Sequence, residues 1–209
     1  MEPVTAGNGT VEEAVAALRA GLPVVLPTDT VYGLSANPYS EESVRRAYRL
    51  KGREDQQPSA LLASDVDMLL ECLPELRGRV GPILRSLLPG PLTLVVPNPA
   101  RRYRWLTGSR PDTIGVRVPK LPEPAAEVLS RRGSVMATSA NLRGEPDPAR
   151  LEDVPEQILG GCAVAIDGGE LPGVPSTVID LTGETPNVLR EGAVPADEAL
   201  EQVAGLIGQ

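Results

Sequence analysis

The chain has 209 residues, a length that suits one well-buried α/β core with at most a short appendage. It contains no histidine, which excludes Ser-His-Asp and Cys-His catalysis and every zinc site that needs imidazole. The net charge of −8 argues against a protein whose main task is to coat nucleic acid nonspecifically. Cys72 and Cys162 lack CxxC spacing, so we expect neither a metal site nor redox chemistry.

The first half of the sequence alternates between predicted helices and strands. Thr10 and Glu13 form a capping-box signature at the start of a helix. The segment 27–38, rich in Thr, Gly and Asn, is predicted to be a loop. The other predicted elements are a helix over 11–20, a buried strand over 22–26, a helix from Ser40 to about 50, a strand over 61–63, a helical hairpin from 65 to about 88 broken at Pro74, and strands over 92–96 and 113–118.

The second half continues the alternation and fixes the predicted fold class. The predicted elements are a helix opened by Pro122 and ending near Arg132, a strand over 135–138, a polar loop through 148, a short helix near 151–159, strands over 163–166, 177–181 and 187–190, and a helix over 196–207. Interleaved helices and strands predict an α/β fold with one sheet covered by helices. The irregular order predicts a mixed sheet in a single domain over 1–209. Without a signal peptide or an apolar run near 18 residues, we expect a soluble cytoplasmic protein.

The loop Pro27-Thr28-Asp29-Thr30-Val31-Tyr32-Gly33-Leu34 directly follows a predicted buried strand. Hydroxyl groups and a flexible glycine at such a strand end are what a ligand-facing loop of an open α/β sheet needs. The alternative is a turn in which Thr and Asp side chains satisfy their own backbone. Composition alone favours that alternative.

Two cations flank a glycine in Lys51-Gly52-Arg53, at the end of the helix that begins near Ser40. Both side chains could reach one polyphosphate from there. A solvated basic helix end is the alternative, because the helix dipole favours cations at this position. No GxxxxGK[ST] motif occurs, so the segment is not a P-loop.

Two later segments also have polar side chains next to strands. In residues 137–146, small side chains would let a ligand approach the backbone, and Ser139 and Asn141 can donate hydrogen bonds to phosphate oxygens. In residues 187–192, Arg190 ends a predicted strand and is well placed to point into a cleft. A polar loop and surface ion pairing are the respective alternatives.

Taken together and in this order, six segments resemble one family, the YrdC-type threonylcarbamoyl-AMP synthases, in its short single-domain form. The resemblance covers roughly residues 10–195. The segments are PTDTVYGL at 27–34, KGR at 51–53, PGPLT at 89–93, TIGVRVP at 113–119, SAN at 139–141 with a following G-x-P, and PSTV at 175–178 with LREG at 189–192.

The resemblance implies a twisted α/β fold with a concave, positively charged substrate cleft. It implies an enzyme, a nucleotidyltransferase that joins L-threonine, bicarbonate or CO2, and ATP into threonylcarbamoyl-adenylate with release of pyrophosphate. Mg2+ would accompany ATP, and no metal site built from protein ligands alone is expected. A separate transferase complex would then modify adenosine 37 of tRNA.

The resemblance also assigns roles to single residues, none of them a covalent or acid–base catalyst. Thr30, Arg117 and Ser176 would bind L-threonine. Lys51, Arg53, Gln57, Thr113, Ser139, Asn141 and Arg190 would bind ATP. Three positions depart from the family pattern: Glu54 replaces a usual Pro, Gln57 stands where Asn or Lys is common, and Leu62 stands where many longer members have His.

Two other functions fit parts of the sequence. A related domain in hydrogenase-maturation carbamoyltransferases builds a carbamoyl-adenylate, but beside acylphosphatase and zinc motifs that are absent from these 209 residues. A non-catalytic module that binds double-stranded RNA or tRNA could use the basic run Arg45, Arg46, Arg49, Lys51 and Arg53. The acidic composition and the scarcity of stacking aromatics weigh against that module, so we expect at most weak RNA binding.

Overall fold

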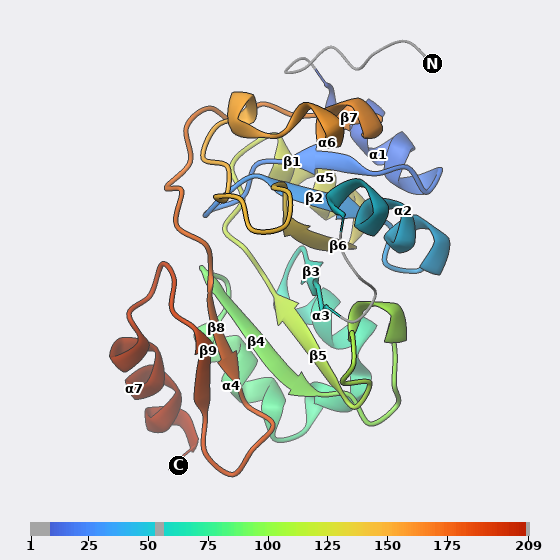
Figure 1. Cartoon of the computed structure of the whole chain (residues 1–209). Helices are drawn as coiled ribbons and strands as arrows, with labels where there is room; N and C mark the ends of the chain where they lie inside the picture. The colour runs from blue at the N-terminus through green and yellow to red at the C-terminus, as the bar shows by residue number, and fades with distance from the viewer. Residues whose placement is uncertain (1–8, 53–56, 208–209) are drawn as a thin grey trace.

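The computed structural model describes residues 9–52 and 57–207 of the chain. Its strands form one twisted sheet in the order β7-β1-β2-β6-β3-β5-β4-β8-β9 (Figure 1). The pairs β1–β7, β3–β5 and β4–β8 are parallel and the other neighbours are antiparallel, which confirms the predicted mixed sheet. The strands are β1 (Val24–Leu26), β2 (Gly33–Ala36), β3 (Ala60–Ala63), β4 (Leu92–Pro97), β5 (Thr113–Arg117), β6 (Ser134–Ser139), β7 (Val164–Ala165), β8 (Thr177–Asp180) and β9 (Asn187–Arg190).

Side-chain caps mark the starts of α1, α2 and α3. The α1 helix has the predicted capping box, in which the Thr10 hydroxyl accepts a hydrogen bond from the Glu13 amide and Glu13 bonds back to the Thr10 amide. The α2 helix is capped by Ser40 and ends at Gly52, whose φ of 63° favours glycine. The helices are α1 (Val11–Arg19), α2 (Glu41–Lys51), α3 (Val66–Cys72), α4 (Val80–Leu87), α5 (Ala125–Arg132), α6 (Glu156–Gly161) and α7 (Ala196–Ile207), with single 3-10 turns η1 (Pro74–Arg77), η2 (Arg104–Leu106) and η3 (Leu151–Asp153).

Alternation along the strands sends large apolar side chains to one face of the sheet. Leu61, Val116 and Leu94 lie next to one another across β3, β5 and β4, and all three are fully buried. They belong to the larger core, which contains buried residues of α2, α3, α4, α6 and α7. This face of the sheet is therefore covered by helices and is closed to ligands.

The opposite face is covered over only part of its width. There α1 and α5 pack against each other and against β1, β6 and the end of β3, and they form a second, smaller core around Leu18, Val128 and Leu62. No residue of β4, β5, β8 or β9 belongs to this smaller core. The sheet face beyond β3 is thus left open on the side away from the larger core.

Three predicted elements differ from the structure. Residues 27–38 were predicted to be a loop, but β2 lies within them and pairs with both β1 and β6. Its sequence Gly-Leu-Ser-Ala has no clear alternation, so the strand depends on its two partners rather than on local pattern. The helix predicted from Pro122 begins at Ala125, after a second proline. The helix predicted near 151–159 is a 3-10 turn followed by α6, because Pro155 interrupts it.

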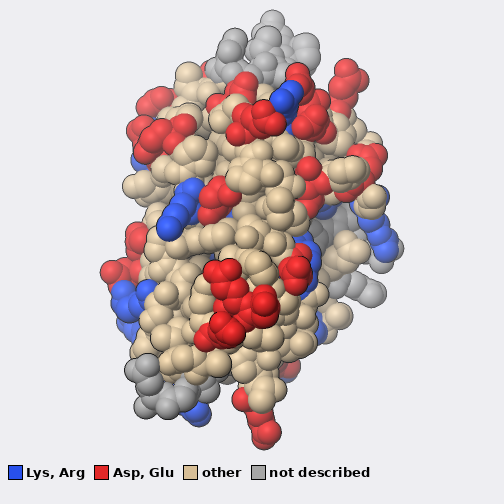
Figure 2. Space-filling view, turned by 90° about the vertical axis from the view of Figure 1, so that its left-hand side faces the viewer, with Lys and Arg blue, Asp and Glu red and all other residues tan. Residues whose placement is uncertain are grey.

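The surface is acidic where α7 lies. This helix is on the left of Figure 1 and therefore on the side that faces the viewer in Figure 2, where one group of acidic side chains lies near the centre and others lie toward the top. Its first turn contains Asp197 and Glu198. Among the residues described, no helix is both long and apolar enough to cross a bilayer.

Candidate active site

A cavity of about 470 Å3 opens on the uncovered face of the sheet. Its floor is built from strand residues that are next in sequence to residues of the larger core and therefore face the opposite side of the sheet. Ala60 of β3 pairs with Gly115 of β5, which pairs with Val95 of β4, and all three line the cavity. The absence of side chains longer than Val in this row leaves room above the sheet. The volume lies within the range of small-molecule and cofactor sites.

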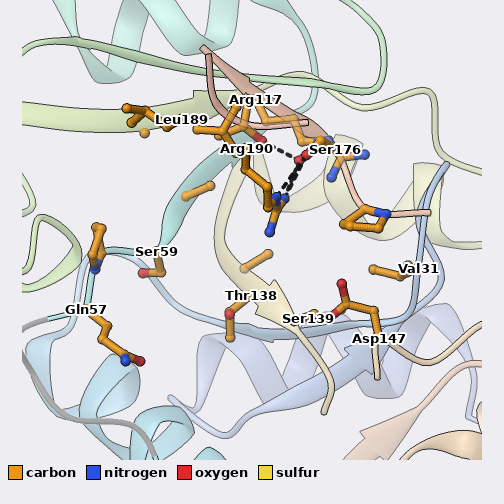
Figure 3. Close-up of a pocket in the computed structure, with 18 of the residues that line it drawn as sticks. Val31, Gln57, Ser59, Arg117, Thr138, Ser139, Asp147, Ser176, Leu189 and Arg190 are labelled. Atoms are coloured by element: carbon orange, nitrogen blue, oxygen red, sulfur yellow. Dashed lines mark hydrogen bonds between the residues drawn. The ribbon is translucent and has the colours of Figure 1, made fainter. Parts of the chain in front are cut away.

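Nine of the ten predicted binding residues line this one cavity, although they are up to 160 positions apart in sequence. They come from both edges of the open face and from the loops above it (Figure 3). The tenth, Arg53, lies outside the described residues, as does Glu54. The nine are Thr30, Lys51, Gln57, Thr113, Arg117, Ser139, Asn141, Ser176 and Arg190.

The Lys51 ammonium is held by the loop that follows β6. Its Nζ donates to the carbonyl oxygens of Ser139 at 2.6 Å and Asn141 at 2.8 Å, and to the side-chain oxygen Oδ1 of Asn141. The Ser139 hydroxyl also donates to this Oδ1, at 2.6 Å. Three of the predicted ATP-binding residues thus form one network. Lys51, at the last residue of α2, fixes the loop that would face a phosphate.

Arg117 at the end of β5 is nine-tenths buried and is tied to the 27–34 loop. Its Nη2 donates to Asp29 Oδ1 and, at 3.0 Å, to Thr30 Oγ1. Desolvation lowers the pKa of Arg117, the nearby Arg190 acts in the same direction, and Asp29 opposes both. Nε is buried and has no hydrogen-bond partner among residues 9–52 and 57–207. Asp29, which sequence reasoning assigned to no role, is therefore the partner that orients Arg117.

The hydroxyls of this loop are also ordered. Thr28 Oγ1 lies 2.9 Å from Thr30 Oγ1 and donates to the Val31 carbonyl oxygen at 2.7 Å. The amides of Thr30 and Val31 both donate to Thr28 Oγ1. The local turn that we considered as an alternative to a ligand-facing loop therefore exists, and the same loop lines the cavity. The two interpretations do not exclude each other.

Arg190 and Ser176 meet on the opposite wall of the cavity. Arg190 donates to the Ser176 carbonyl oxygen from Nη2 at 2.8 Å and from Nε at 3.2 Å, and Nη2 lies 3.2 Å from the Ser176 hydroxyl (Figure 3). The Ser176 hydroxyl also bonds to Thr93 Oγ1 at 2.8 Å. Thr93 belongs to the PGPLT segment, and its place on the same sheet face as Val95 is the signal that could have identified it.

The rim near Thr113 contains a basic residue that sequence reasoning missed. Arg110 lines the cavity and is held by Asp180 of β8 through Nη1 at 3.1 Å and Nη2 at 3.2 Å. The Thr113 hydroxyl donates to the Arg110 carbonyl oxygen at 3.2 Å. No predicted element covered residues 98–112, so nothing in the sequence placed Arg110 beside the other cations. Leu62, one of the departures from the family pattern, lies in the cavity wall and packs in the smaller core.

The chain is similar to proteins of one family in both sequence and structure. The family model for Sua5, YciO and YrdC proteins, described as "Telomere recombination", matches residues 16–192. The threonylcarbamoyl-AMP synthase of Pyrococcus abyssi is 37% identical over 91% of this chain and 56% of its own length. That of Halorhodospira halophila is 34% identical over 87% of this chain and 90% of its own. The crystal structure of P. abyssi Sua5 complexed with L-threonine has a TM-score of 0.80 at 37% identity, covering 95% of this chain and 57% of that one.

The chain therefore spans little more than half the length of the P. abyssi protein, but nearly all of the length of the H. halophila one. The family match covers most of the described residues, including those of the cavity. The family-model match over residues 16–192 and the similarity to these relatives show that the chain belongs to the Sua5/YciO/YrdC family.

Proposed function

We propose that this chain is a threonylcarbamoyl-AMP synthase, which joins L-threonine, bicarbonate or CO2, and ATP into threonylcarbamoyl-adenylate and releases pyrophosphate. The observation that carries the proposal is the direct contact of Arg190 with Ser176 in a single cavity. It brings a residue expected to bind ATP against one expected to bind threonine. An enzyme that joins these two substrates needs their sites to be contiguous.

ATP is proposed to lie across Lys51, Ser139, Asn141 and Arg190, with Thr113 and Gln57 at the rim. Among the described lining residues, five are basic and one is acidic, a balance that suits a triphosphate: Lys51, Arg110, Arg117, Arg143, Arg190 and Asp147. Mg2+ is proposed to accompany the nucleotide. Arg53 stays a predicted ATP ligand outside the described residues.

L-Threonine is proposed to lie near Thr30, Arg117 and Ser176. Nη2 of Arg117 is already bonded to Asp29 and Thr30, and Nε is buried. Nη1 is then the guanidinium nitrogen available for the substrate carboxylate. A contact through one nitrogen is weaker than the bidentate contact that Arg offers in general.

The proposed chemistry asks little covalent work of the protein. The threonine amine attacks CO2 and loses a proton, giving a carbamate. A carbamate oxygen then attacks the α-phosphorus of ATP, and the bond from that phosphorus to the bridging oxygen of pyrophosphate breaks. Fixed cations and hydroxyls would position the reactants and neutralise charge. A chain without histidine can supply both effects.

The product, an activated carbamate, needs a second enzyme to accept it. We propose a threonylcarbamoyl transferase complex that acts on adenosine 37 of tRNA. We also propose a cytoplasmic location, which the two free, buried cysteines support.

The test is incubation of the purified chain with Mg-ATP, L-threonine and bicarbonate, followed by mass spectrometry. We expect pyrophosphate and an adenylate with the mass of threonylcarbamoyl-AMP, both abolished when threonine is omitted. Isotopically labelled bicarbonate should shift the adenylate by one mass unit per labelled carbon. Pyrophosphate release that does not depend on threonine would overturn the proposal.

A further inference from the structure

The charged residues of the cavity differ in whether they have a partner of opposite charge. Arg117 is paired with Asp29, and Arg110 is paired with Asp180. Asp147 is the one carboxylate among the described lining residues, and it makes no hydrogen bond or ion pair within the described part of the chain. Arg190 bonds only to Ser176 among the residues described. An unpaired cation and an unpaired anion therefore line the same cavity.

Asp147 lies on the wall opposite Arg190. It is half-buried, on the loop that follows β6, and its side chain points into the cavity on the same side as Ser139 and Val31 (Figure 3). The neighbouring Pro148 carbonyl oxygen accepts a hydrogen bond from the Tyr32 amide at 2.9 Å, which fixes the backbone beside Asp147. The carboxylate is thus held at the cavity by a fixed backbone while its oxygens stay free for a ligand.

Given the proposed function, an unpaired carboxylate here needs a specific explanation. A triphosphate near Lys51 and Ser139 would be repelled by a neighbouring carboxylate unless a cation stood between them. Magnesium ions in nucleotide sites are commonly bound by one or two carboxylates together with substrate phosphates, not by cages made of protein alone. The residues here fit that ion, because Asp147 offers one carboxylate and Ser139 lines the same side of the cavity with a hydroxyl group.

We propose that Asp147 is the protein ligand of the divalent cation that accompanies ATP. This proposal rests on the proposed function, because it requires the triphosphate to lie in the cavity. It assigns the one free carboxylate a role that the six sequence motifs do not contain. The alternative for the same carboxylate is a hydrogen bond from a ribose hydroxyl of the nucleotide.

The two roles differ in how they depend on the metal. We would titrate ATP by calorimetry into the wild-type chain and Asp147→Asn, without threonine or bicarbonate, once in excess Mg2+ and once in EDTA. We expect Asp147→Asn to weaken Mg-ATP binding about tenfold or more, and to leave metal-free ATP binding unchanged or several-fold tighter because a repulsive charge is gone. With Mn2+ in place of Mg2+, electron paramagnetic resonance of the bound Mn-ATP should change in Asp147→Asn.

The matched control is Asp67→Asn, on α3 at the helix-covered face, where the carboxylate pairs with the exposed Arg85. It makes the same change of charge and should keep the ratio of Mg-ATP to metal-free ATP affinity. Asp147→Glu keeps a carboxylate, so it should still prefer Mg-ATP to metal-free ATP, but less strongly than the wild type does. Melting curves of all variants check the fold.

Three results would overturn the proposal. If both affinities fell equally in Asp147→Asn and deoxy-ATP analogues lost nothing further, the ribose contact would be correct. An unchanged ratio with unchanged affinities would mean that Asp147 does not contact the metal–nucleotide complex. Both results leave the proposed function intact. A wild-type chain that binds ATP in neither condition would instead overturn the proposed function itself, and this inference with it.

Discussion

Arg190 and Ser176 are joined by hydrogen bonds from one guanidinium group to both the carbonyl oxygen and the hydroxyl of the serine. Both residues line the cavity, but Ser176 is almost fully buried and Arg190 is exposed, so the arginine offers the larger surface to a ligand. A ligand phosphate that pulled the guanidinium toward itself would change the hydrogen bonding of Ser176. The two proposed substrate sites therefore share one hydrogen-bonded pair of residues, Arg190 and Ser176.

Replacing Arg190 should affect both substrates, but unequally. Arg190→Ala removes a cation expected to contact ATP, so ATP binding should weaken roughly 10- to 150-fold, corresponding to about 1.5–3 kcal/mol for a hydrogen bond to a charged group. Threonine binding should weaken by less, through the freed Ser176. Calorimetric titration of each ligand separately measures both. Arg77→Ala, which removes an exposed cation paired with Glu71, is the control and should change neither. Loss of threonine affinity alone would contradict the assignment.

Arg117 should have the opposite selectivity, with a cost in stability. Arg117→Ala should weaken threonine binding and leave ATP binding nearly intact. It also leaves Asp29 with much of its surface buried and no cation, so the free energy of unfolding should fall by about 3 kcal/mol. Arg117→Lys keeps the charge but loses the planar group, and should recover only part of both losses. Titrations of the two ligands and denaturant melts measure these effects.

The double variant Arg117→Ala, Asp29→Asn separates the loss of threonine binding from the loss of stability in Arg117→Ala. It removes the unpaired charge, so its stability should be higher than the sum of the single losses predicts. Threonine binding should stay weak in the double variant. If threonine affinity returned with stability, Arg117 would act through the fold and not through contact with the ligand.

Lys51 should matter for order in the loop after β6 as well as for ATP. Lys51→Met keeps the length of the side chain but removes the donor from the carbonyl oxygens of Ser139 and Asn141. We expect a loss of about 1–3 kcal/mol in the free energy of unfolding and weaker ATP binding. Amide hydrogen exchange should be faster at 139–145 than in the wild type. Unchanged exchange there, with ATP affinity lost, would limit Lys51 to direct contact with the nucleotide.

Gly192 tests whether the backbone around Ser176 sets the site. A Cβ on Gly192 would overlap the carbonyl oxygen of Pro175 and lie 2.7 Å from the carbonyl carbon of Ser176. Gly192→Ala must therefore move the segment 175–176 and should lower affinity for both substrates. Gly160→Ala in α6 meets nothing within 4 Å and should be neutral or slightly stabilising. Equal behaviour of the two variants in ligand titrations would show that the close approach is tolerated.

RNA binding should be weak and sensitive to salt. Arg45 and Arg46 of α2 are each paired with a glutamate one turn earlier, Glu41 and Glu42, which reduces the basic character of this helix. Any affinity for a tRNA should fall steeply between 50 and 200 mM salt in a filter-binding or anisotropy assay. Tight, sequence-selective binding that survives near 0.3 M salt would favour the RNA-binding module instead.

The sequence predicted most of the fold because local signals and tertiary structure agree. The capping residues Thr10 and Ser40 start helices where predicted. The apolar run at β4 and the alternating segment at β5 become interior strands of the sheet. The failure at β2 has the opposite cause: a strand of Gly, Leu, Ser and Ala is stabilised by pairing on both sides, which no local window contains.

The site was predicted in its motif residues but not in their partners. Arg117 and Ser176 lie in recognisable segments, whereas Asp180 is important because it holds Arg110, which lies in the loop before β5. Asp147 gives no signal in sequence, since its significance is that nothing described is paired with it. Whether two such side chains pair depends on their proximity in the folded chain, which no local sequence pattern shows.

The position of β8 and β9 at one end of the strand order has a consequence for synthesis of the protein. Ser176 and Arg190 come from the last fifth of the chain, while the loop with Thr30 is made first. A nascent chain that ends before residue 176 contains the residues of β1 to β7 but lacks Ser176 and Arg190, and so lacks the cavity wall that they form. Binding of either proposed substrate would then begin late in translation, after β8 and β9 have been made.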